Sequence, residues 1–299
     1  MSKQNISIVG LGSMGYGIAQ SILRAGHGVQ GFDINSDVAA RFAAEGGLNR
    51  PQPDAAADCD VLVVVVLNGK QTQSVLFDEG GWAGQMRKGA TIIACATVAP
   101  EFAKDMERRC GAHGLHYLDA PISGGAAKAA MGKLSVMASG SKAAFDGAAP
   151  SLDAMAEKVF ELGDSAGAGS AMKAVNQLLA GVHIAAMAEA MTFGMTQGVT
   201  PDKFVEVISQ CAGTSWMLEN RAPHIVEGDY SPRSSVDIWP KDLGIVLDIA
   251  KSAKFGAPLT AAALQQFLAA SGSGLGGEDD AAVAKVYARN AGLTLPGED

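Results

Sequence analysis

A glycine-rich turn between a short apolar strand and a helix is the feature that most restricts how this chain folds. Residues 6–9 form the predicted strand, the sequence GLGSMG follows at once, and residues 16–25 have a helical pattern. In such a turn the first glycine permits the bend, the second lets backbone N–H groups approach a pyrophosphate, and the third lets the helix pack on the strand. An ordinary glycine-rich turn is the alternative, but the setting between strand and helix favours dinucleotide binding. The predicted cofactor-binding residues are Gly10, Leu11, Gly12, Ser13, Met14 and Gly15.

An acidic residue, Asp33, closes the second predicted strand, residues 28–32. A carboxylate in this position accepts hydrogen bonds from both ribose hydroxyls of NAD and repels the 2′-phosphate of NADP. The next residues, Ile34, Asn35 and Ser36, include no arginine or lysine that would bind such a phosphate. We therefore expect NAD as the cofactor and Asp33 as one of its ligands. A helix cap is the alternative role for this aspartate.

Strand and helix patterns alternate up to residue 163. The run at residues 61–67 is β-branched and apolar without alternation, as in a strand buried on both faces of a parallel sheet. Residues 159–162 are expected to close this sheet. The alternation predicts a doubly wound α/β domain. The remaining predicted elements here are strands at 91–96, 116–119 and 134–138 and helices at 37–45 and 100–113.

The pattern changes after Gly163, where strand-like runs almost disappear. Residues 170–197 form one long helical stretch, rich in alanine and methionine and apolar nearly all round, which predicts a buried helix between two domains. We expect an N-terminal Rossmann domain over residues 1–164 and an all-helical substrate and oligomerisation domain over residues 165–299, joined by this helix. Shorter helices are predicted at 202–211, 216–221, 239–255, 258–271 and 279–288.

Composition narrows the classes of partner. Of 299 residues, 48% are hydrophobic and 18% are charged, and the formal net charge is −8. An acidic chain does not attract nucleic acid or anionic lipid, so neither is an expected partner. The longest apolar run, residues 61–67, is too short to span a bilayer, and the N-terminus lacks a signal-peptide layout. No two of the four cysteines have CxxC spacing, so we expect no metal site and buried, reduced thiols in the cytoplasm.

Three polar side chains interrupt the start of the long helix. Lys173, Asn176 and Gln177 are spaced i, i+3 and i+4, so they project from one helical face among apolar neighbours. Desolvation lowers the pKa of a lysine, which would make Lys173 a general acid and base near neutral pH. The two amides would then hold substrate hydroxyls. The alternative is a solvated surface lysine with its stem on the core.

A second candidate group follows the predicted strand at residues 116–119. Ser123, Gly124 and Gly125 would expose backbone N–H groups that can hold a substrate carboxylate. A purely structural turn explains the same residues equally well. The residues alone leave both interpretations open.

Four motifs occur in the order typical of one enzyme family. The motifs lie at residues 10–15, 119–125, 169–177 and 241–243. From about residue 6 to residue 287 the chain resembles the β-hydroxyacid dehydrogenases, so we expect an NAD-dependent oxidation of a small hydroxy acid. The resemblance implies that Lys173 is the catalytic acid and base and that residues 123–125 bind the substrate carboxylate. It also implies an NAD site lined by Leu67, Asn68, Thr97 and Lys241, of which Lys241 also approaches the substrate.

One departure from the family pattern concerns the substrate. The family usually has asparagine four residues after the catalytic lysine, and this chain has Gln177. Gln177, His183 and Asn220 would bind the hydroxyls of a four-carbon sugar acid, although His183 is alternatively a core histidine. Arg221 would meet a carboxylate or lie on a helix surface. The segments that resemble the family members acting on L-threonate are residues 177–186 and 215–221.

Other hypotheses remain within the family and outside it. Within the family the alternatives are 3-hydroxyisobutyrate dehydrogenase and tartronate semialdehyde (2-hydroxy-3-oxopropionate) reductase. A 6-phosphogluconate enzyme is disfavoured because no Arg/Lys cluster flanks the catalytic helix, and imine reductases generally lack the lysine. A non-catalytic NAD-binding sensor is the alternative from another class. The long apolar helix also predicts a homo-oligomer, either a dimer or a tetramer.

Overall fold

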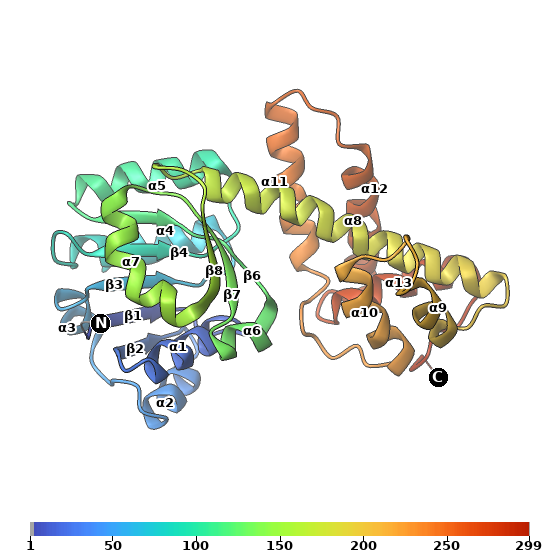
Figure 1. Ribbon diagram of the computed structural model, residues 1–299, viewed down its shortest axis with the longest axis horizontal. Helices are drawn as coiled ribbons and strands as arrows, with labels where there is room; N and C mark the ends of the chain where they lie inside the picture. The colour runs from blue at the N-terminus through green and yellow to red at the C-terminus, as the bar shows by residue number, and fades with distance from the viewer. Residues whose placement is uncertain (1–2, 299) are drawn as a thin grey trace. The chain divides into compact units, whose positions relative to one another are not determined.

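The computed structural model describes residues 3–298 of the chain. The chain divides into two compact units, Met1–Lys173 and Ala174–Asp299. The division lies within α8 (Ala168–Thr196), which is a single uninterrupted helix (Figure 1). The first unit is α/β and the second is helical, which confirms the predicted fold class.

A five-stranded parallel sheet forms the centre of the first unit. Its strand order is β2-β1-β3-β4-β5, and each neighbouring pair runs parallel. Strands connected through helices in this order give the doubly wound arrangement that the sequence predicts. The strands are β1 (Asn5–Val9), β2 (Gly28–Phe32), β3 (Val61–Val64), β4 (Thr91–Ala94) and β5 (His116–Asp119).

Each face of this sheet carries its own apolar core. Along β3, Val61 and Val63 pack into one core, and Leu62 and Val64 pack into the other. Because both faces are covered, this strand needs no polar alternation. The first core is covered by α1 (Gly15–Arg24), α2 (Ser36–Ala44), α6 (Gly125–Met131) and α7 (Lys142–Met155). The second is covered by α3 (Gln52–Ala57), α4 (Gly69–Phe77), the 3-10 turn Trp82–Gly84 and α5 (Pro100–Ala112).

Two strands end earlier than predicted. The sequence predicts strands over residues 61–67 and 91–96, but β3 ends at Val64 and β4 ends at Ala94. The register of β3 with β1 stops at the pair Val9 and Val64, where the chain leaves the sheet. Apolar, β-branched composition continues past this point, so composition alone does not mark the edge of the sheet.

Three strands form a separate small sheet instead of extending the first. Strand β7 (Leu134–Ala138) pairs antiparallel with β6 (Ile122–Ser123) and parallel with β8 (Ala156–Glu161). The prediction that residues 159–162 close the main sheet is therefore wrong. Pro121 lies between β5 and β6 and has no N–H group to donate, which favours a break in the ladder at this point.

The second unit is built on the remainder of α8. Met187 of this helix is buried in one core with Trp239 and Phe267, whose rings stack with centroids 5.4 Å apart. Gly181 lets a neighbouring helix lie against α8, because a Cβ at this position would stand 2.8 Å from Leu243 Cδ2. The other helices are α9 (Pro201–Ile208), α10 (Trp216–Glu227), α11 (Ile238–Ser252), α12 (Pro258–Ala270) and α13 (Ala284–Asn290).

Helix α10 continues beyond its predicted end at residue 221 in spite of Pro223 inside it. A proline within a helix removes one hydrogen bond, and the residue before it disfavours helical geometry, so the sequence predicts an earlier end. Ala222 and Ile225, on either side of the proline, are fully buried in the core of the second unit. This tertiary packing keeps the helix intact past the proline.

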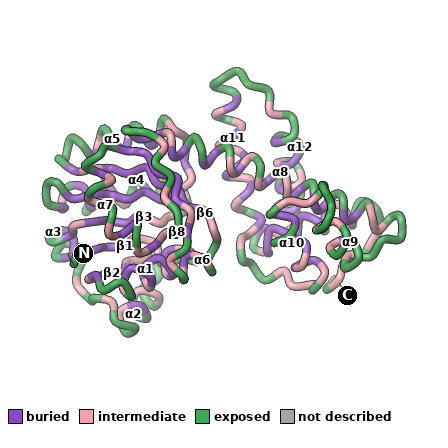
Figure 2. The backbone as a smooth tube through the Cα atoms, viewed as in Figure 1, coloured by how far each residue is buried: buried purple, intermediate pink, exposed green. Residues whose placement is uncertain are grey.

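Helix α8 is less buried than its composition predicts. Val175, Leu179 and Phe193 are 54%, 49% and 66% exposed, so only part of the helix surface is covered in this chain (Figure 2). By length and composition alone the helix is apolar enough to cross a membrane, with a mean hydropathy of 1.4 over an 18-residue window. One such helix is weak evidence for a membrane span, because core helices of soluble proteins meet the same criteria.

Three of the four cysteines are buried as predicted: Cys59, Cys95 and Cys110. Burial raises the pKa of the Cys59 thiol to about 11 and the pKa of the Cys95 and Cys110 thiols to about 12. Cys211 is exposed, so the prediction of burial is wrong at this position. The predicted helix 202–211 ends as α9 at Ile208, which leaves this cysteine in the loop that follows.

Candidate active site

The parallel strands of the main sheet bring several predicted residues to its carboxyl edge. Gly10 follows β1, Asp33 follows β2, and Leu67 and Asn68 lie beyond the end of β3. Thr97 lies beyond the end of β4. Because parallel strands end at the same side of a sheet, positions far apart in sequence meet at this edge. Ligands of open α/β sheets bind outside the carboxyl ends of the strands.

The glycine turn has backbone geometry that side chains would prevent. Gly10 has φ +96°, and a Cβ there would stand 2.3 Å from the carbonyl oxygen of Val65. A Cβ on Gly15 would stand 1.8 Å from the carbonyl oxygen of Gly10, so α1 starts in direct contact with the turn. A Cβ on Gly12 would meet no atom within 4 Å. The turn therefore leaves open space at Gly12, as a cradle for a dinucleotide requires.

Asp33 is bound to this turn through backbone groups. Its carboxylate accepts hydrogen bonds from the N–H groups of Leu11, over 2.7 Å, and Asn35, over 2.9 Å. The cap of α2 is Asn35, whose side chain accepts from the Asp37 N–H over 3.1 Å. The alternative role of Asp33 as the side-chain cap is therefore not observed, and its carboxylate lies beside the glycine turn.

The next two loops present one exposed and two partly buried residues. Leu67 is 55% exposed, and its N–H donates to Gln71 Oε1. The side chain of Asn68 caps α4 by accepting from the Gln71 N–H over 2.9 Å. Thr97 is half-buried. Asn68 therefore has a structural role as a helix cap in addition to its position at the carboxyl edge.

Two glycines link β6 to α6 in conformations that side chains rarely adopt. Gly124 has φ +137° and Gly125 has φ +75°. A Cβ on Gly124 would stand 3.0 Å from the Lys128 side chain, whereas a Cβ on Gly125 would meet open space. Ser123 ends β6 and is half-buried. The backbone at Gly125 is thus accessible to a ligand.

Lys173 lies against the strand that leads into these glycines. Its side chain is on α8, and Nζ donates a hydrogen bond to the carbonyl oxygen of Ile122 over 2.9 Å. The residue is 8% exposed, which excludes a solvated surface lysine. The structure thus brings together Lys173 and the Ser123–Gly125 segment. A desolvated lysine close to a candidate carboxylate site is suited to proton transfer.

Asp119 is a buried residue to which sequence analysis assigns no role. Its carboxylate accepts from the N–H groups of Gly167, over 3.0 Å, and Ser170, over 2.8 Å. It also accepts from the Ser170 hydroxyl over 2.7 Å and the Ser139 hydroxyl over 3.3 Å. Burial raises the pKa of Asp119, and the hydrogen bonds from Ser170, Gly167 and Ser139 oppose this shift. The carboxylate holds the start of α8, one turn before Lys173.

In the second unit four polar side chains form a hydrogen-bonded chain, which we call the polar row: Asn176, Gln177, Asp242 and Lys241. Asn176 Nδ2 donates to Gln177 Oε1 over 2.9 Å, and Gln177 Nε2 donates to Asp242 Oδ2 over 2.5 Å. Lys241 Nζ donates to Asp242 Oδ1 over 2.5 Å. Asp242 is 2% exposed and binds two predicted site residues directly, Gln177 and Lys241, although sequence analysis assigns it no role.

The structure also shows the surroundings of three further candidates, Arg221, Asn220 and His183. Arg221 pairs with the fully buried Asp280, with Nε 2.5 Å from Oδ1. Asn220 is exposed and its side-chain oxygen accepts from Arg221. Of the two interpretations left open for Arg221, the structure therefore favours contact with a carboxylate, which is that of Asp280, over a position on the helix surface. His183 is half-buried on α8, so it is not a fully buried core histidine.

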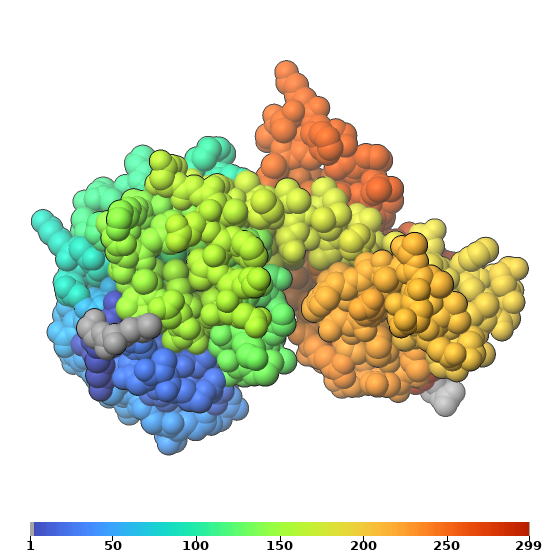
Figure 3. Space-filling view, in the orientation of Figure 1, coloured from blue at the N-terminus to red at the C-terminus, as the bar shows by residue number. Residues whose placement is uncertain are grey.

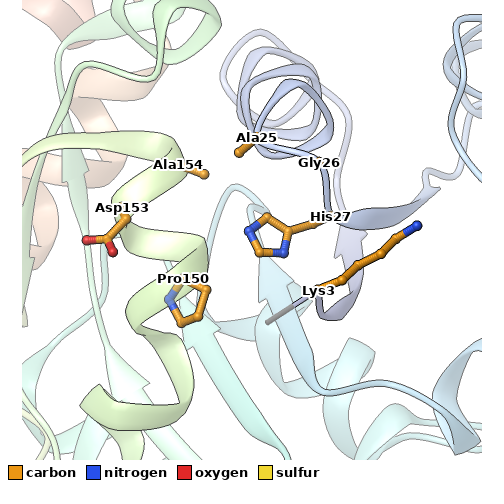
Figure 4. A pocket seen from close by; sticks show the side chains of 7 residues that line it. All are labelled: Lys3, Ala25, Gly26, His27, Pro150, Asp153 and Ala154. Atoms are coloured by element: carbon orange, nitrogen blue, oxygen red, sulfur yellow. The ribbon is translucent and has the colours of Figure 1, made fainter. Parts of the chain in front are cut away.

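A pocket of about 380 Å³ lies away from all these residues (Figure 4). It is lined by Lys3, Ala25, Gly26, His27, Pro150, Asp153 and Ala154. Lys3 precedes β1 and His27 precedes β2, so the pocket lies at the amino ends of these strands. It is at the opposite edge of the sheet from the glycine turn.

Models of two protein families match most of the chain. The NAD binding domain of 6-phosphogluconate dehydrogenase matches residues 5–163. The model described as the NAD-binding domain of NADP-dependent 3-hydroxyisobutyrate dehydrogenase matches residues 167–287. Both units are therefore covered by models from related nicotinamide-dependent dehydrogenases.

Individual relatives match over nearly the whole length. An L-threonate dehydrogenase of Cupriavidus necator is 51% identical over 297 residues, which is 99% of each chain. An L-threonate dehydrogenase of Escherichia coli K12 is 46% identical and covers 99% of this chain and 98% of the relative. A crystal structure described as 3-hydroxyisobutyrate dehydrogenase from Salmonella typhimurium has 47% identity, a TM-score of 0.89, and coverage of 94% of this chain and 99% of that one.

Proposed function

Because the chain belongs to the β-hydroxyacid dehydrogenase family, we propose that it oxidises the four-carbon sugar acid L-threonate at C2, with NAD as the hydride acceptor. Membership makes the chain a nicotinamide-dependent hydroxyacid dehydrogenase and not a non-catalytic sensor. The choice of substrate is supported by the names of the Cupriavidus necator and Escherichia coli relatives. The polar row is the observation on which this choice depends.

The polar row favours a substrate with several hydroxyl groups. Gln177 is 7% exposed and Asn176 is half-buried, so both amides lie where bulk water gives limited compensation for a missing partner. Within the polar row Gln177 is bonded to Asn176 and Asp242, but each amide oxygen can accept two hydrogen bonds. Hydroxyls of a sugar acid can donate to the remaining acceptor positions, whereas 3-hydroxyisobutyrate has a single hydroxyl. A site that leaves buried polar groups unpaired disfavours the poorer ligand by a large factor.

Lys173 is proposed to carry the proton. When bound, NAD accepts a hydride from the carbinol carbon, and the hydroxyl on that carbon must lose its proton. An alcohol does not ionise near neutral pH, so a positioned base is required. Neutral Lys173 takes this proton at Nζ in oxidation and returns it in reduction. The backbone of Ser123, Gly124 and Gly125 orients the substrate carboxylate, and Asn176 and Gln177 hold the remaining hydroxyls.

The carboxyl edge of the sheet fits NAD. The bend at Gly10, the open space at Gly12 and the close start of α1 at Gly15 suit a pyrophosphate at the helix N-terminus. We place the adenosine ribose at Asp33, whose charge opposes a 2′-phosphate. Although the model for residues 167–287 is described as NADP-dependent, Asp33 favours NAD. Leu67, Asn68 and Thr97 would line the same site, with Lys241 toward the reacting end.

A panel of hydroxy acids tests the proposal. With NAD reduction followed by absorbance, L-threonate should give the highest kcat/KM among L-threonate, 3-hydroxyisobutyrate, glycerate and 6-phosphogluconate. Oxidation of NADH in the presence of tartronate semialdehyde tests the alternative that the protein is a reductase of that compound. The second candidate is 3-hydroxyisobutyrate, because the Salmonella typhimurium structure carries that description. A highest kcat/KM for 3-hydroxyisobutyrate would replace L-threonate and leave the family assignment intact.

We further propose a cytoplasmic homo-oligomer, a dimer or tetramer. Apolar side chains stay exposed on α8, and the α11–α12 hairpin projects from the rest of the second unit (Figure 3). Phe255 and Leu259 in this hairpin are 66% and 69% exposed. Such apolar surface is typical of protein contacts. Light scattering after size-exclusion chromatography gives the subunit number, and a monomer at micromolar concentration would refute the proposal.

A further inference from the structure

We propose that Asp242 sets the direction of hydrogen bonding along the polar row and so selects hydroxy acids that carry a second hydroxyl group. The inference rests on the proposed function, in which Asn176 and Gln177 hold the substrate. Asp242 acts through these two amides, so it is a positioning residue. It does not itself take part in hydride or proton transfer.

The direction follows from the chemistry of the carboxylate. An ionised carboxylate only accepts hydrogen bonds, so Gln177 must turn its NH2 group toward Asp242, as the 2.5 Å bond from Nε2 to Oδ2 shows. The carbonyl Oε1 of Gln177 then faces Asn176, so Asn176 must donate a hydrogen bond to it from its own NH2 group, over 2.9 Å. The oxygen Oδ1 of Asn176 is therefore the group at the outer end of the row, and it is an acceptor.

Lys241 fixes the inner end of the row. An ammonium group only donates, and Nζ of Lys241 lies 2.5 Å from the other carboxylate oxygen of Asp242. Asp242 is 2% exposed and Gln177 is 7% exposed, so water does not readily replace a lost partner. Reversing one amide while Asp242 is ionised would leave a buried group unpaired, at about 1–3 kcal/mol. The native direction is thus held from the end of the row formed by Lys241 and Asp242.

The outer acceptor determines which ligand fits. A hydroxyl group of the substrate can donate to Asn176 Oδ1, whereas a methyl or methylene group cannot. Asn176 lies one helical turn after Lys173 on α8, so the donor would be a second hydroxyl and not the one that Lys173 deprotonates. A four-carbon sugar acid has such a hydroxyl. Its deoxy counterpart, 2-hydroxybutyrate, lacks both the 3- and the 4-hydroxyl.

The substitution Asp242→Asn tests the direction with almost no change of shape. Because Lys241 only donates, the oxygen of the new amide would face Lys241 and its NH2 group would face Gln177. Gln177 and Asn176 would then both turn over, and the outer end of the row would become a donor. We expect kcat/KM for L-threonate to fall roughly 10–100-fold, mainly through KM, because one buried hydrogen bond is lost. We expect less than a threefold change for 2-hydroxybutyrate.

Two further variants separate this role from a structural one. Asp248→Asn makes the same change at an exposed position of α11 and should leave both substrates unaffected. Adding Gln177→Glu to Asp242→Asn places the carboxylate on α8, where it accepts from both neighbours and returns Asn176 to its native direction. This double variant should recover most of the activity on L-threonate. If it is insoluble, the split between KM and kcat in the single variant decides.

The outcomes distinguish this inference from the proposed function. An equal loss on both substrates in Asp242→Asn, or a soluble double variant no better than the single one, would overturn the role of Asp242. A native enzyme that prefers another hydroxy acid would overturn the choice of L-threonate. In that case kcat/KM of the same variants is measured for the preferred acid and for its deoxy counterpart. A loss confined to the preferred acid would then support the role of Asp242, and an equal loss on both acids would overturn it.

Discussion

The carboxyl edge of the main sheet and the polar row of the second unit are built from different parts of the chain. At the edge, Gly10 and Gly15 set the geometry through their backbone, because a Cβ at either position would collide with a carbonyl oxygen. In the polar row, Gln177 and Asp242 set the geometry through side chains that are 65 residues apart in sequence. A backbone turn suits a phosphate, which is common to many ligands. A row of polar side chains can instead form hydrogen bonds that match the hydroxyl groups of one particular ligand. We therefore expect cofactor binding and substrate choice to respond to different substitutions.

The largest effect expected from this comparison is that of Lys173→Ala. Loss of the general base should lower turnover by roughly 10²–10⁴-fold. NAD affinity should change little, because the glycine turn is untouched. Steady-state kinetics and NAD titration measure the two quantities, and Lys142→Ala, at a side chain that is 86% exposed, is the control. Near-native turnover of Lys173→Ala at saturating substrate would rule out this lysine as the base.

Arg221→Ala tests whether side-chain pairs also support the second unit. Removing the guanidinium leaves the fully buried Asp280 without its charge partner, and we expect the free energy of unfolding to fall by about 3–5 kcal/mol. Urea denaturation measures this loss. The control is Arg233→Ala, because the Arg233–Asp229 pair is largely exposed and contributes about 0–1 kcal/mol. A stable Arg221→Ala protein with a raised KM would instead place Arg221 at the substrate.

Asp33 is the side chain at the carboxyl edge that should matter for cofactor choice. Replacing Asp33→Ser together with Ile34→Arg removes the repulsion of a 2′-phosphate and supplies a cation. The ratio of kcat/KM for NAD to that for NADP should fall roughly 10–100-fold, the worth of one or two charge-assisted hydrogen bonds. Asp37→Ser, at an exposed position of α2, is the control. Equal use of both cofactors by the native protein would show that the backbone alone determines binding.

The smallest expected effect concerns Asp119 and pH. Because burial raises the pKa of Asp119, the folded state binds a proton at this carboxyl more readily than the unfolded chain does. Its contribution to stability is complete below the unfolded-state pKa and declines as pH rises through the folded-state pKa. Asp119→Asn is neutral throughout, so the native protein should lose stability relative to this variant as pH increases from 4 to 7. Urea denaturation across this pH range measures the difference in free energy of unfolding between the native protein and the variant. A difference that stays constant, or that moves in favour of the native protein as pH rises, would contradict the prediction.

The sequence predicts those parts of the molecule whose signal is local. The strand, glycine turn and helix around Gly10 follow from neighbouring residues, and the long run of α8 follows from its composition. Helices α3, α4, α6 and α7 escape prediction, because their segments have no clear apolar period. Those of α3, α6 and α7 are rich in alanine, and that of α4 begins with the polar run at residues 70–74. The end of β3 at Val64 escapes it as well, since an apolar run does not show where its neighbours stop.

In the candidate site, too, the sequence predicts the local features and not the contacts between distant residues. The spacing of Lys173, Asn176 and Gln177 on one helix is visible in the sequence. The hydrogen bonds that hold them are not, because Asp119 reaches Ser170 over 51 positions and Asp242 reaches Gln177 over 65. Asp119 and Asp242 lie inside the motifs at residues 119–125 and 241–243, so an acidic residue within a motif that also holds predicted site residues is the signal that would have found them.

Helix α8 also limits how the two units of this protein can be exchanged between homologues. Lys173 is the last residue of the first unit and Ala174 the first of the second, yet both belong to one helix without a linker. Inserting a single residue between Lys173 and Asn176 would rotate the amides about 100° around the helix axis relative to the lysine. Exchange of the second unit between homologues, whether in evolution or in the laboratory, therefore requires a junction that preserves helical phase. Chimeras joined in phase within α8 should stay active, and those displaced by one residue should not.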